Sequence, residues 1–256
     1  MAIAFGAAGA TSTTVTSSCT PSYPAVSAGD YLLLTLVTKY ADRTHNTPSG
    51  WTALGSVSGG AGTDGTANEG QVKLSVYGKQ ADGTESGTLT VTVSGGTANV
   101  ISGRISSLTK GGSETWDVVG SLTASDNTAG TDLVFAYGSD PGITANDWLV
   151  TAWAINSDAY THTHALTCSG LSSITTASRG NVAVTSGAHA RYGFVTHAIG
   201  AGTSSGNATY TNTASGSATN APAGASILVR VRVSGGGGGG TIAPISAGYH
   251  LRGVNR

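Results

Sequence analysis

The chain contains two closely related stretches, SAGDYLLL at residues 27–34 and TANDWLVT at residues 144–151. A second related pair follows in the same order, ADGTESG at residues 81–87 and GAGTSSG at residues 200–206. In each half, a turn that contains Asp leads into an apolar run. A repeat with so long a period is not that of a solenoid. It predicts the duplication of one small β module.

Apolar and polar residues alternate with a period of two at residues 72–77, 88–93 and 227–234, as in strands with one face on a core. Residues 31–37 and 148–155 are almost continuously apolar. We expect these two matching segments to be central strands that are covered on both faces. No stretch has apolar residues at helical spacing over three turns.

Short turn sequences rich in Gly, Asp and Pro separate the expected strands. This spacing predicts an all-β fold, an antiparallel β-sandwich or jelly-roll-like architecture with two related halves. The expected organisation is a first β module at residues 1–112 and a second at 113–234. The sequence leaves open whether the two halves share one core.

Three segments are expected to be irregular: residues 59–70, residues 203–225, which we expect to hold weak strands around a long loop, and the six glycines at 235–240. The six glycines have the composition of a flexible tether. Residues 241–256 follow the tether and carry regularly placed apolar and basic side chains. They are interpreted as a C-terminal docking arm, with a disordered terminus as the alternative. The candidate docking residues are Ile242, Ile245, Tyr249, Leu251, Arg252 and Arg256.

Charged residues make up only 10% of the 256 residues, and the formal net charge is −1. A globular protein usually carries about a quarter of charged residues, so we expect outward sheet faces of Thr and Ser. The near-neutral charge argues against binding to a nucleic-acid backbone. No segment reaches the length of a membrane span, and the N-terminus lacks the features of a signal peptide. The expectation is therefore a protein made in a cytosol, with no membrane insertion.

The two cysteines, Cys19 and Cys168, fall at non-equivalent places in the two halves. We expect free or buried thiols, although the sequence alone leaves a disulfide possible.

His162 and His164 form the best candidate for a metal site, because residues at i and i+2 of a strand point to the same face. His45 holds the corresponding place in the first half, and His197 lies on a later strand. A zinc site needs three or four ligands, and no Cys or carboxylate stands at ligand spacing. We therefore expect surface or interface histidines, with no metal or other cofactor.

The sequence gives no sign of an enzyme. It lacks a G-x-S-x-G nucleophile elbow, and most of its few acidic residues stand in expected turns. Asp30 and Asp147 recur at the same strand entry in both halves, for which a structural turn role is the better explanation.

Exposed tryptophans can serve as platforms for sugars. Trp51 follows a Ser-Gly turn, and Trp116 lies between the two halves, so these two are the candidates for contact with a glycan.

Several stretches together resemble a group of bacteriophage and prophage structural proteins: MAIAF at 1–5, AGDYLL at 28–33, PSGWTALG at 48–55, LSVYGKQA at 74–81 and NDWLV at 146–150. The resemblance covers about residues 1–234 and contains no catalytic signature. It implies β-sandwich proteins of phage heads or tails, and the tether and arm lie outside it.

The resulting expectation is an accessory capsid decoration or cement protein of a virion, assembled in the host cytoplasm and docked through its C-terminal arm. Its expected partners are copies of itself, as a homotrimer, and the major capsid protein or tail subunits. Two alternatives remain: a tail, baseplate or fibre protein that contributes to binding a host surface glycan, and a carbohydrate-binding module.

Overall fold

The structure is a computed structural model, and it describes residues 3–64, 68–97, 99–158, 160–185, 188–215 and 222–234. The expected tether and docking arm, residues 235–256, lie outside the described residues. Within the described part of the chain, every regular element is a β-strand, and none is a helix that is long and apolar enough to cross a membrane.

Nine strands build the first module: β1 (Ala4–Ala8), β2 (Ser12–Thr14), β3 (Ser18–Cys19), β4 (Tyr31–Lys39), β5 (Thr44–His45), β6 (Thr52–Ala61), β7 (Gly70–Gln80), β8 (Val91–Ser94) and β9 (Ile101–Thr109). Eight build the second: β10 (Thr115–Asp126), β11 (Asp132–Ala136), β12 (Trp148–Ile155), β13 (Thr161–Cys168), β14 (Leu171–Val184), β15 (Ala190–Gly202), β16 (Ala208–Ser215) and β17 (Gly224–Ser234).

The second module repeats the topology of the first, strand for strand. Each has an inner sheet, with the orders β1-β9-β4-β7-β6 and β10-β17-β12-β15-β14. Each also has a three-stranded outer sheet, with the orders β3-β8-β5 and β11-β16-β13. Among the described strands only β2, which pairs with β9, has no counterpart. The prediction of an all-β antiparallel sandwich with two related halves is confirmed.

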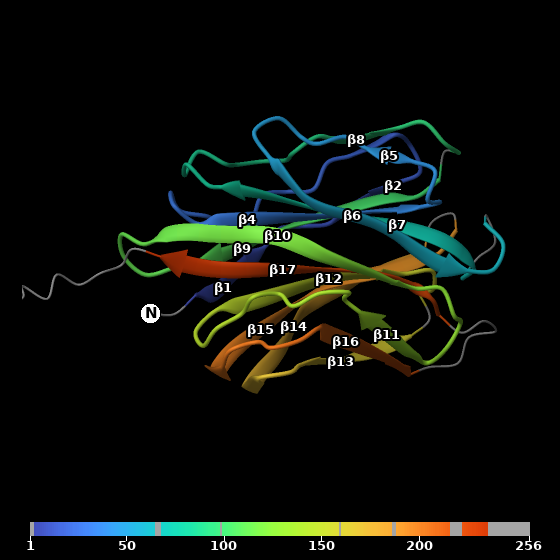
Figure 1. Cartoon of the computed structure of the whole chain (residues 1–256). Coiled ribbons are helices and arrows are strands. Elements are labelled where there is room, and N and C mark those ends of the chain that lie inside the picture. The colour runs from blue at the N-terminus through green and yellow to red at the C-terminus, as the bar shows by residue number, and fades with distance from the viewer. Residues whose placement is uncertain are drawn as a thin grey trace, which may run out of the picture.

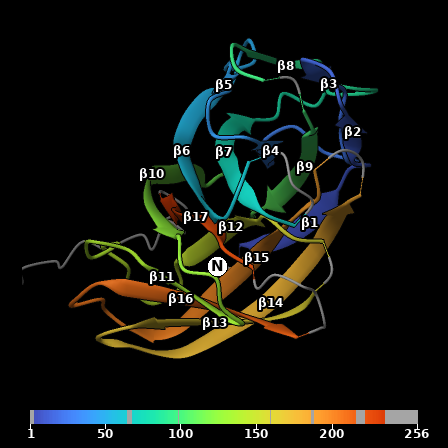
Figure 2. The same ribbon diagram turned by 90° about the vertical axis from the view of Figure 1, so that its right-hand side faces the viewer.

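The four sheets stack as four layers, with the first module above the second in Figure 1. The two inner sheets face each other, and the outer sheets lie on the far sides, as the turned view in Figure 2 also shows. Three apolar cores fill the spaces between the layers. The two halves therefore share a central core in addition to a core of their own.

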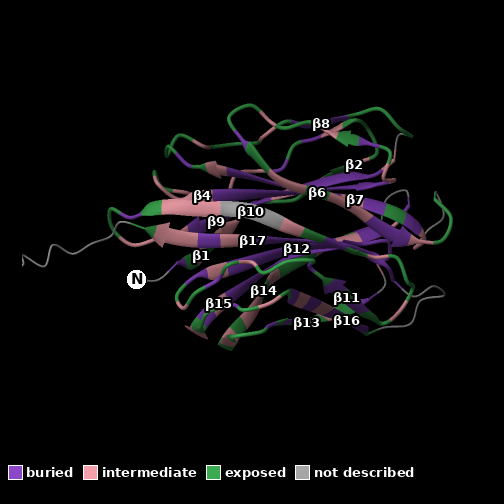
Figure 3. Cartoon of the chain, viewed as in Figure 1, coloured by how far each residue is buried: buried purple, intermediate pink, exposed green. Residues whose placement is uncertain are grey.

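The central strands β4 and β12 are covered on both faces, as their apolar runs predict (Figure 3). In β4, Leu33 and Val37 enter the central core, while Leu32, Leu34 and Leu36 enter the core of the first module. Strand β12 divides its side chains between the central core and the core of the second module in the same way. Each inner sheet thus needs a partner on either side.

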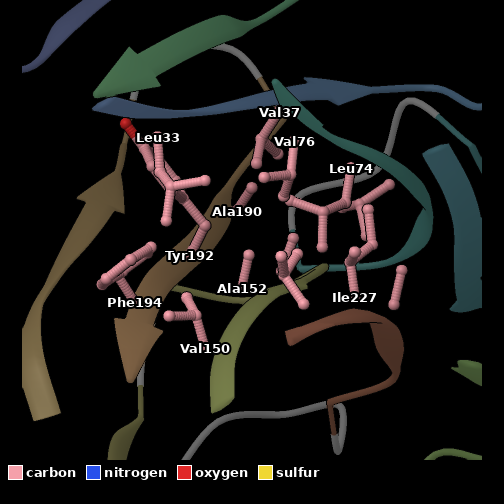
Figure 4. Packing of buried hydrophobic residues seen from close by; sticks show 14 of the residues in the cluster. Leu33, Val37, Leu74, Val76, Val150, Ala152, Ala190, Tyr192, Phe194 and Ile227 are labelled. Carbon is pink, nitrogen blue, oxygen red and sulfur yellow. The ribbon is translucent and has the colours of Figure 1, made fainter. Parts of the chain in front are cut away.

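The central core is lined by short and branched side chains from both modules (Figure 4). Leu33 and Val76 contribute from the first inner sheet, and Val150, Phe194 and Ile227 contribute from the second. All of them are at most 3% exposed. Burial of this apolar surface is the main force that joins the modules.

The segment at 59–70 is more regular than predicted, whereas the segment at 203–225 holds strands, as expected. Strand β6 continues to Ala61 and includes Gly59 and Gly60. Both residues lie so close to other backbone segments that only glycine fits there. A Cβ atom at Gly59 would collide with the carbonyl oxygen of Gly224. The segment at 203–225 holds all of β16 and the start of β17. The alternation at residues 227–234 predicts a strand with one face on a core, but Leu228, on the other face of β17, is also buried, in the core of the second module.

The two recurring aspartates have the structural turn role that the sequence indicated. The Asp30 carboxylate accepts a hydrogen bond from the backbone N–H of Ser27 at 2.8 Å. The Asp147 carboxylate accepts one from the backbone N–H of Thr144 at 2.9 Å. Both side chains therefore close the turn before a central strand.

Cys19 and Cys168 are free and buried, as expected. Cys19 belongs to the core of the first module and Cys168 to that of the second. Burial raises the pKa of the Cys19 thiol to about 12.

A buried polar junction joins the modules at one end of the central strands. Lys39, which is fully buried, donates from Nζ to the carbonyl oxygens of Asn156 (3.1 Å) and His189 (3.0 Å). The Asn156 side chain donates to the carbonyls of Ala61 and Gly70 and accepts from the backbone N–H of Ala223. Burial lowers the pKa of Lys39 to about 8. Asn156 thus satisfies three backbone groups from both modules.

We predict that Asn156→Ala lowers the free energy of unfolding by about 2–4 kcal/mol, because it leaves buried backbone groups without partners. Urea unfolding followed by fluorescence measures the loss. The control is Asn46→Ala, which removes exposed hydrogen bonds to Thr92 and Ser94 and is expected to cost under about 1 kcal/mol. Equal losses in the two variants would contradict the role given to Asn156.

Candidate functional site

His162 and His164 lie on β13 and point to the same face, as their spacing predicts. Their rings are stacked with centroids 6.4 Å apart, and both pack on Trp153, at 4.6 and 5.5 Å. Nδ1 of His162 lies 2.8 Å from the side-chain oxygen of Asn212, and Nδ1 of His164 lies 2.7 Å from the hydroxyl of Tyr210. The two imidazoles therefore line the interior of the second module.

This position corrects the expectation of surface or interface histidines. Burial lowers the pKa of both His162 and His164 from 6.5 to about 4. His197 on β15 is fully buried, bonded to Thr151 at 2.9 Å and to Thr176 at 2.9 Å, and burial lowers its pKa to about 3. At neutral pH the three rings are uncharged parts of a packed interior.

The described residues contain no group of three or more His, Cys, Asp or Glu side chains that could hold a metal ion. Nε2 of His162 and Nε2 of His164 are buried without a hydrogen-bond partner. Two imidazoles fall short of the three or four protein ligands that zinc sites use.

Neither candidate tryptophan presents an open ring face to a glycan. Trp51 is 7% exposed and belongs to the core of the first module. Trp116 is half-buried beside the central core, packs on Tyr31 at 5.7 Å and donates from Nε1 to the carbonyl of Gly29 at 2.7 Å. The six candidate docking residues of the arm all lie outside the described residues.

A groove in the first module, lined by both polar and apolar residues, was not predicted from the sequence. It has a volume of about 280 Å³ and lies between β5 and the strands β6 and β7. Its polar lining comes from three alternating positions of β7, one residue of β6 and the β5 segment: Lys73, Ser75, Tyr77, Ser56, Thr44, His45 and Thr47. Ala53, Leu54 and Gly55 of β6 complete the lining. The groove exists because β5 is two residues long, whereas its counterpart β13 is eight.

A chain of hydrogen bonds crosses the wall of this groove. His45 bonds through Nε2 to the Thr38 hydroxyl and through Nδ1 to the Ser75 hydroxyl, both at 2.8 Å. Ser75 donates in turn to the hydroxyl of Ser56 at 2.9 Å. Burial, together with the positive charges of Lys73 and Arg43, lowers the pKa of His45 to about 3.

The contact between Ser75 and His45 lacks what nucleophilic catalysis requires. A general base works best with a pKa near the working pH, and that of His45 lies far below it. No carboxylate orients the ring, since its other nitrogen bonds to Thr38. Ser75 is only 1% exposed. The pair is a structural hydrogen bond.

The corresponding space in the second module is filled by a tryptophan. Leu36 and Ser75 are directly paired in β4 and β7, and Trp153 and Gly193 are paired at the same places of β12 and β15. Gly193 admits the indole, since a Cβ atom there would lie 2.7 Å from Trp153. Replacement of this pair by Leu36 and Ser75 leaves room for the polar chain of the first module.

No protein-family model, no curated protein and no solved structure matches the chain.

We predict that the free energy of unfolding falls as the pH falls from about 6.5 toward 4. His197 has a lower pKa in the folded state than the ordinary 6.5, so the unfolded chain binds more protons in this window. The contribution of His197 to the free energy of unfolding is complete above pH 6.5. As the pH falls below 6.5, this contribution decreases by up to about 1.4 kcal/mol per pH unit. Urea unfolding at several pH values measures the slope. The variant His197→Gln should have a shallower slope, and an unchanged one would disprove the assignment.

We predict that Gly193→Ala destabilises the protein by about 1–3 kcal/mol, because the new methyl group would overlap the Trp153 ring. The matched control is Gly138→Ala, where an added Cβ atom meets nothing within 4 Å and stability should stay level or rise slightly. Thermal unfolding of both variants tests the comparison. A loss in the control alone would refute the packing argument.

Proposed function

We propose that the chain is a non-catalytic structural protein of a bacteriophage particle, an accessory subunit of the capsid surface. The observation that carries this proposal is the fusion of two sandwich modules through a common core. Four stacked sheets form a body in which each inner sheet is held on both faces. Such a body suits a protein that serves as a rigid building block. The resemblance of residues 1–234 to phage structural proteins supplies the phage context.

The outer face of the second module supports a role in packing against neighbours. Its exposed residues on β13 are Thr161, Thr163, Ala165 and Thr167, which are uncharged. Val134 on β11 adds an apolar side chain that is 48% exposed. Asp132, at the start of β11, is a charged residue exposed on the same face. The uncharged remainder of this face can approach another protein surface without leaving unpaired charges buried. Copies of the same chain, in a trimer, are the proposed neighbours.

The C-terminal arm is proposed to dock the protein on the particle. Strand β17 ends at Ser234, and the six glycines follow directly. Ile242, Ile245, Tyr249 and Leu251 would supply apolar contacts, and Arg252 and Arg256 would pair with acidic groups of the partner. A flexible tether loses entropy when its arm is ordered, which many simultaneous contacts on a symmetric lattice offset.

A tail or baseplate protein that binds a host glycan is the second candidate. The observation in its favour is the groove beside His45 and Lys73, which is open to a small ligand. The burial of Trp51 weakens the third candidate, a carbohydrate-binding module with an aromatic platform.

The test is electron cryomicroscopy of purified particles that carry either the full chain or a chain ending at Ser234. We expect density on the capsid surface with the full chain and its loss with the truncated one. Density confined to the tail would favour the second candidate. Absence of the chain from purified particles, checked by mass spectrometry, would refute a virion role, and full docking of the truncated chain would refute the arm.

A further inference from the structure

We propose that the groove of the first module binds a small oxyanion group, such as the carboxylate or phosphate of an acidic saccharide. The groove is the one lined by Thr44, His45, Ser56, Lys73 and Ser75. This inference goes beyond the proposed structural role and does not depend on it.

The hydrogen-bond chain in the groove wall ends on a free donor. Ser75 donates its one hydrogen to Ser56, so the bond between Ser75 and His45 must be donated by Nδ1 of His45. Nε2 of His45 is then the acceptor of the bond to the Thr38 hydroxyl at 2.8 Å, which is shorter than the 3.4 Å from this hydroxyl to its other acceptor, the carbonyl of Tyr40. Every bond in the chain therefore points toward Ser56, whose own hydroxyl hydrogen has no acceptor among the described residues. Aligned hydrogen bonds polarise one another and strengthen this last donor.

Lys73 adds a positive charge beside that donor. It has no hydrogen bond or ion pair with any described residue, although it lines the groove. The corresponding residue of the second module is Arg191, since Lys73 pairs with Thr38 where Arg191 pairs with Ile155. Arg191 is already engaged, because it donates to the carbonyl of Asp158 at 2.6 Å and to Asn181. Of these two corresponding residues, only Lys73 has a charged group that is free to bind a ligand.

The charges that act on His45 from the surrounding strands are those of Lys73 on β7 and Arg43 before β5, both positive. A site with this potential, an ammonium group and hydroxyl donors favours an anion with several acceptor oxygens.

The lining also argues for an anionic group over a neutral sugar face. Apart from the His45 imidazole, which bonds to Thr38 and Ser75, the aromatic ring in the lining is that of Tyr77. Tyr77 is 3% exposed, and its hydroxyl donates to the carbonyl of His45. Stacking on a sugar ring is therefore not offered. The volume of about 280 Å³ lies near the lower end of the range of small-ligand pockets, roughly 300–1,000 Å³, which suits one sugar unit.

The test is a titration of the isotope-labelled full chain with glucuronate, inorganic phosphate and glucose, followed by amide NMR. We expect saturable shifts centred on Ser56, Lys73 and Ser75 with glucuronate. Lys73→Met should weaken the binding by roughly tenfold or more, the loss expected for one charge-assisted hydrogen bond. Ser56→Ala should weaken it by a smaller factor. Lys110→Met, outside the groove, should leave it unchanged, and the spectra of all variants report whether the fold is intact.

Binding of phosphate as well as glucuronate would show that the oxyanion suffices, and binding of glucuronate alone would show that the sugar ring contributes. Both outcomes support the proposal. Glucose shifts equal to those of glucuronate, unchanged binding by Lys73→Met, or no saturable shift with any of the three probes would overturn it. None of these outcomes bears on whether the protein belongs to a virion.

Discussion

Burial of both faces of β4 and β12 is the constraint on which the rest of the fold depends. An outer sheet covers one face of each inner sheet, and only the other module can cover the second face. If the modules separated, Val150, Phe194 and their neighbours would meet water, and Lys39 would lose its carbonyl partners. The two halves therefore act as one stable unit, although each has the topology of a complete sandwich.

Much of this fold could be predicted from the sequence because strand patterns are local. Unbroken apolar runs identified the central strands, and alternation of polar and apolar residues identified β7. The alternation at residues 227–234 predicts one buried face for β17, and only the neighbours of this strand in the sheet show that Leu228 on the other face is buried as well. Gly59 looked like a loop residue because the close approach of Gly224 is a contact between modules.

The site was less predictable for a similar reason. The spacing of His162 and His164 correctly placed them on one face, but the direction of that face depends on Trp153 and the partner strand β16. The groove beside Lys73 results from the short β5 and from the pairing of Leu36 with Ser75. Local sequence patterns do not show which residues pair across strands. Comparison of the paired residues in the two halves is the signal that could have found it.

The replacement of Trp153 and Gly193 by Leu36 and Ser75 has a consequence for valency. In a dimer of two identical single-module chains, both sandwiches would have the same residue pair. Either both would contain the groove, or a tryptophan would fill the space in both. Because the two modules are parts of one chain, their sequences can differ. The second module has Trp153 in the space where the first module has the groove. Each chain then presents this groove once, so a ring of such chains would display as many copies of it as the ring has subunits, all facing the same way relative to the ring axis.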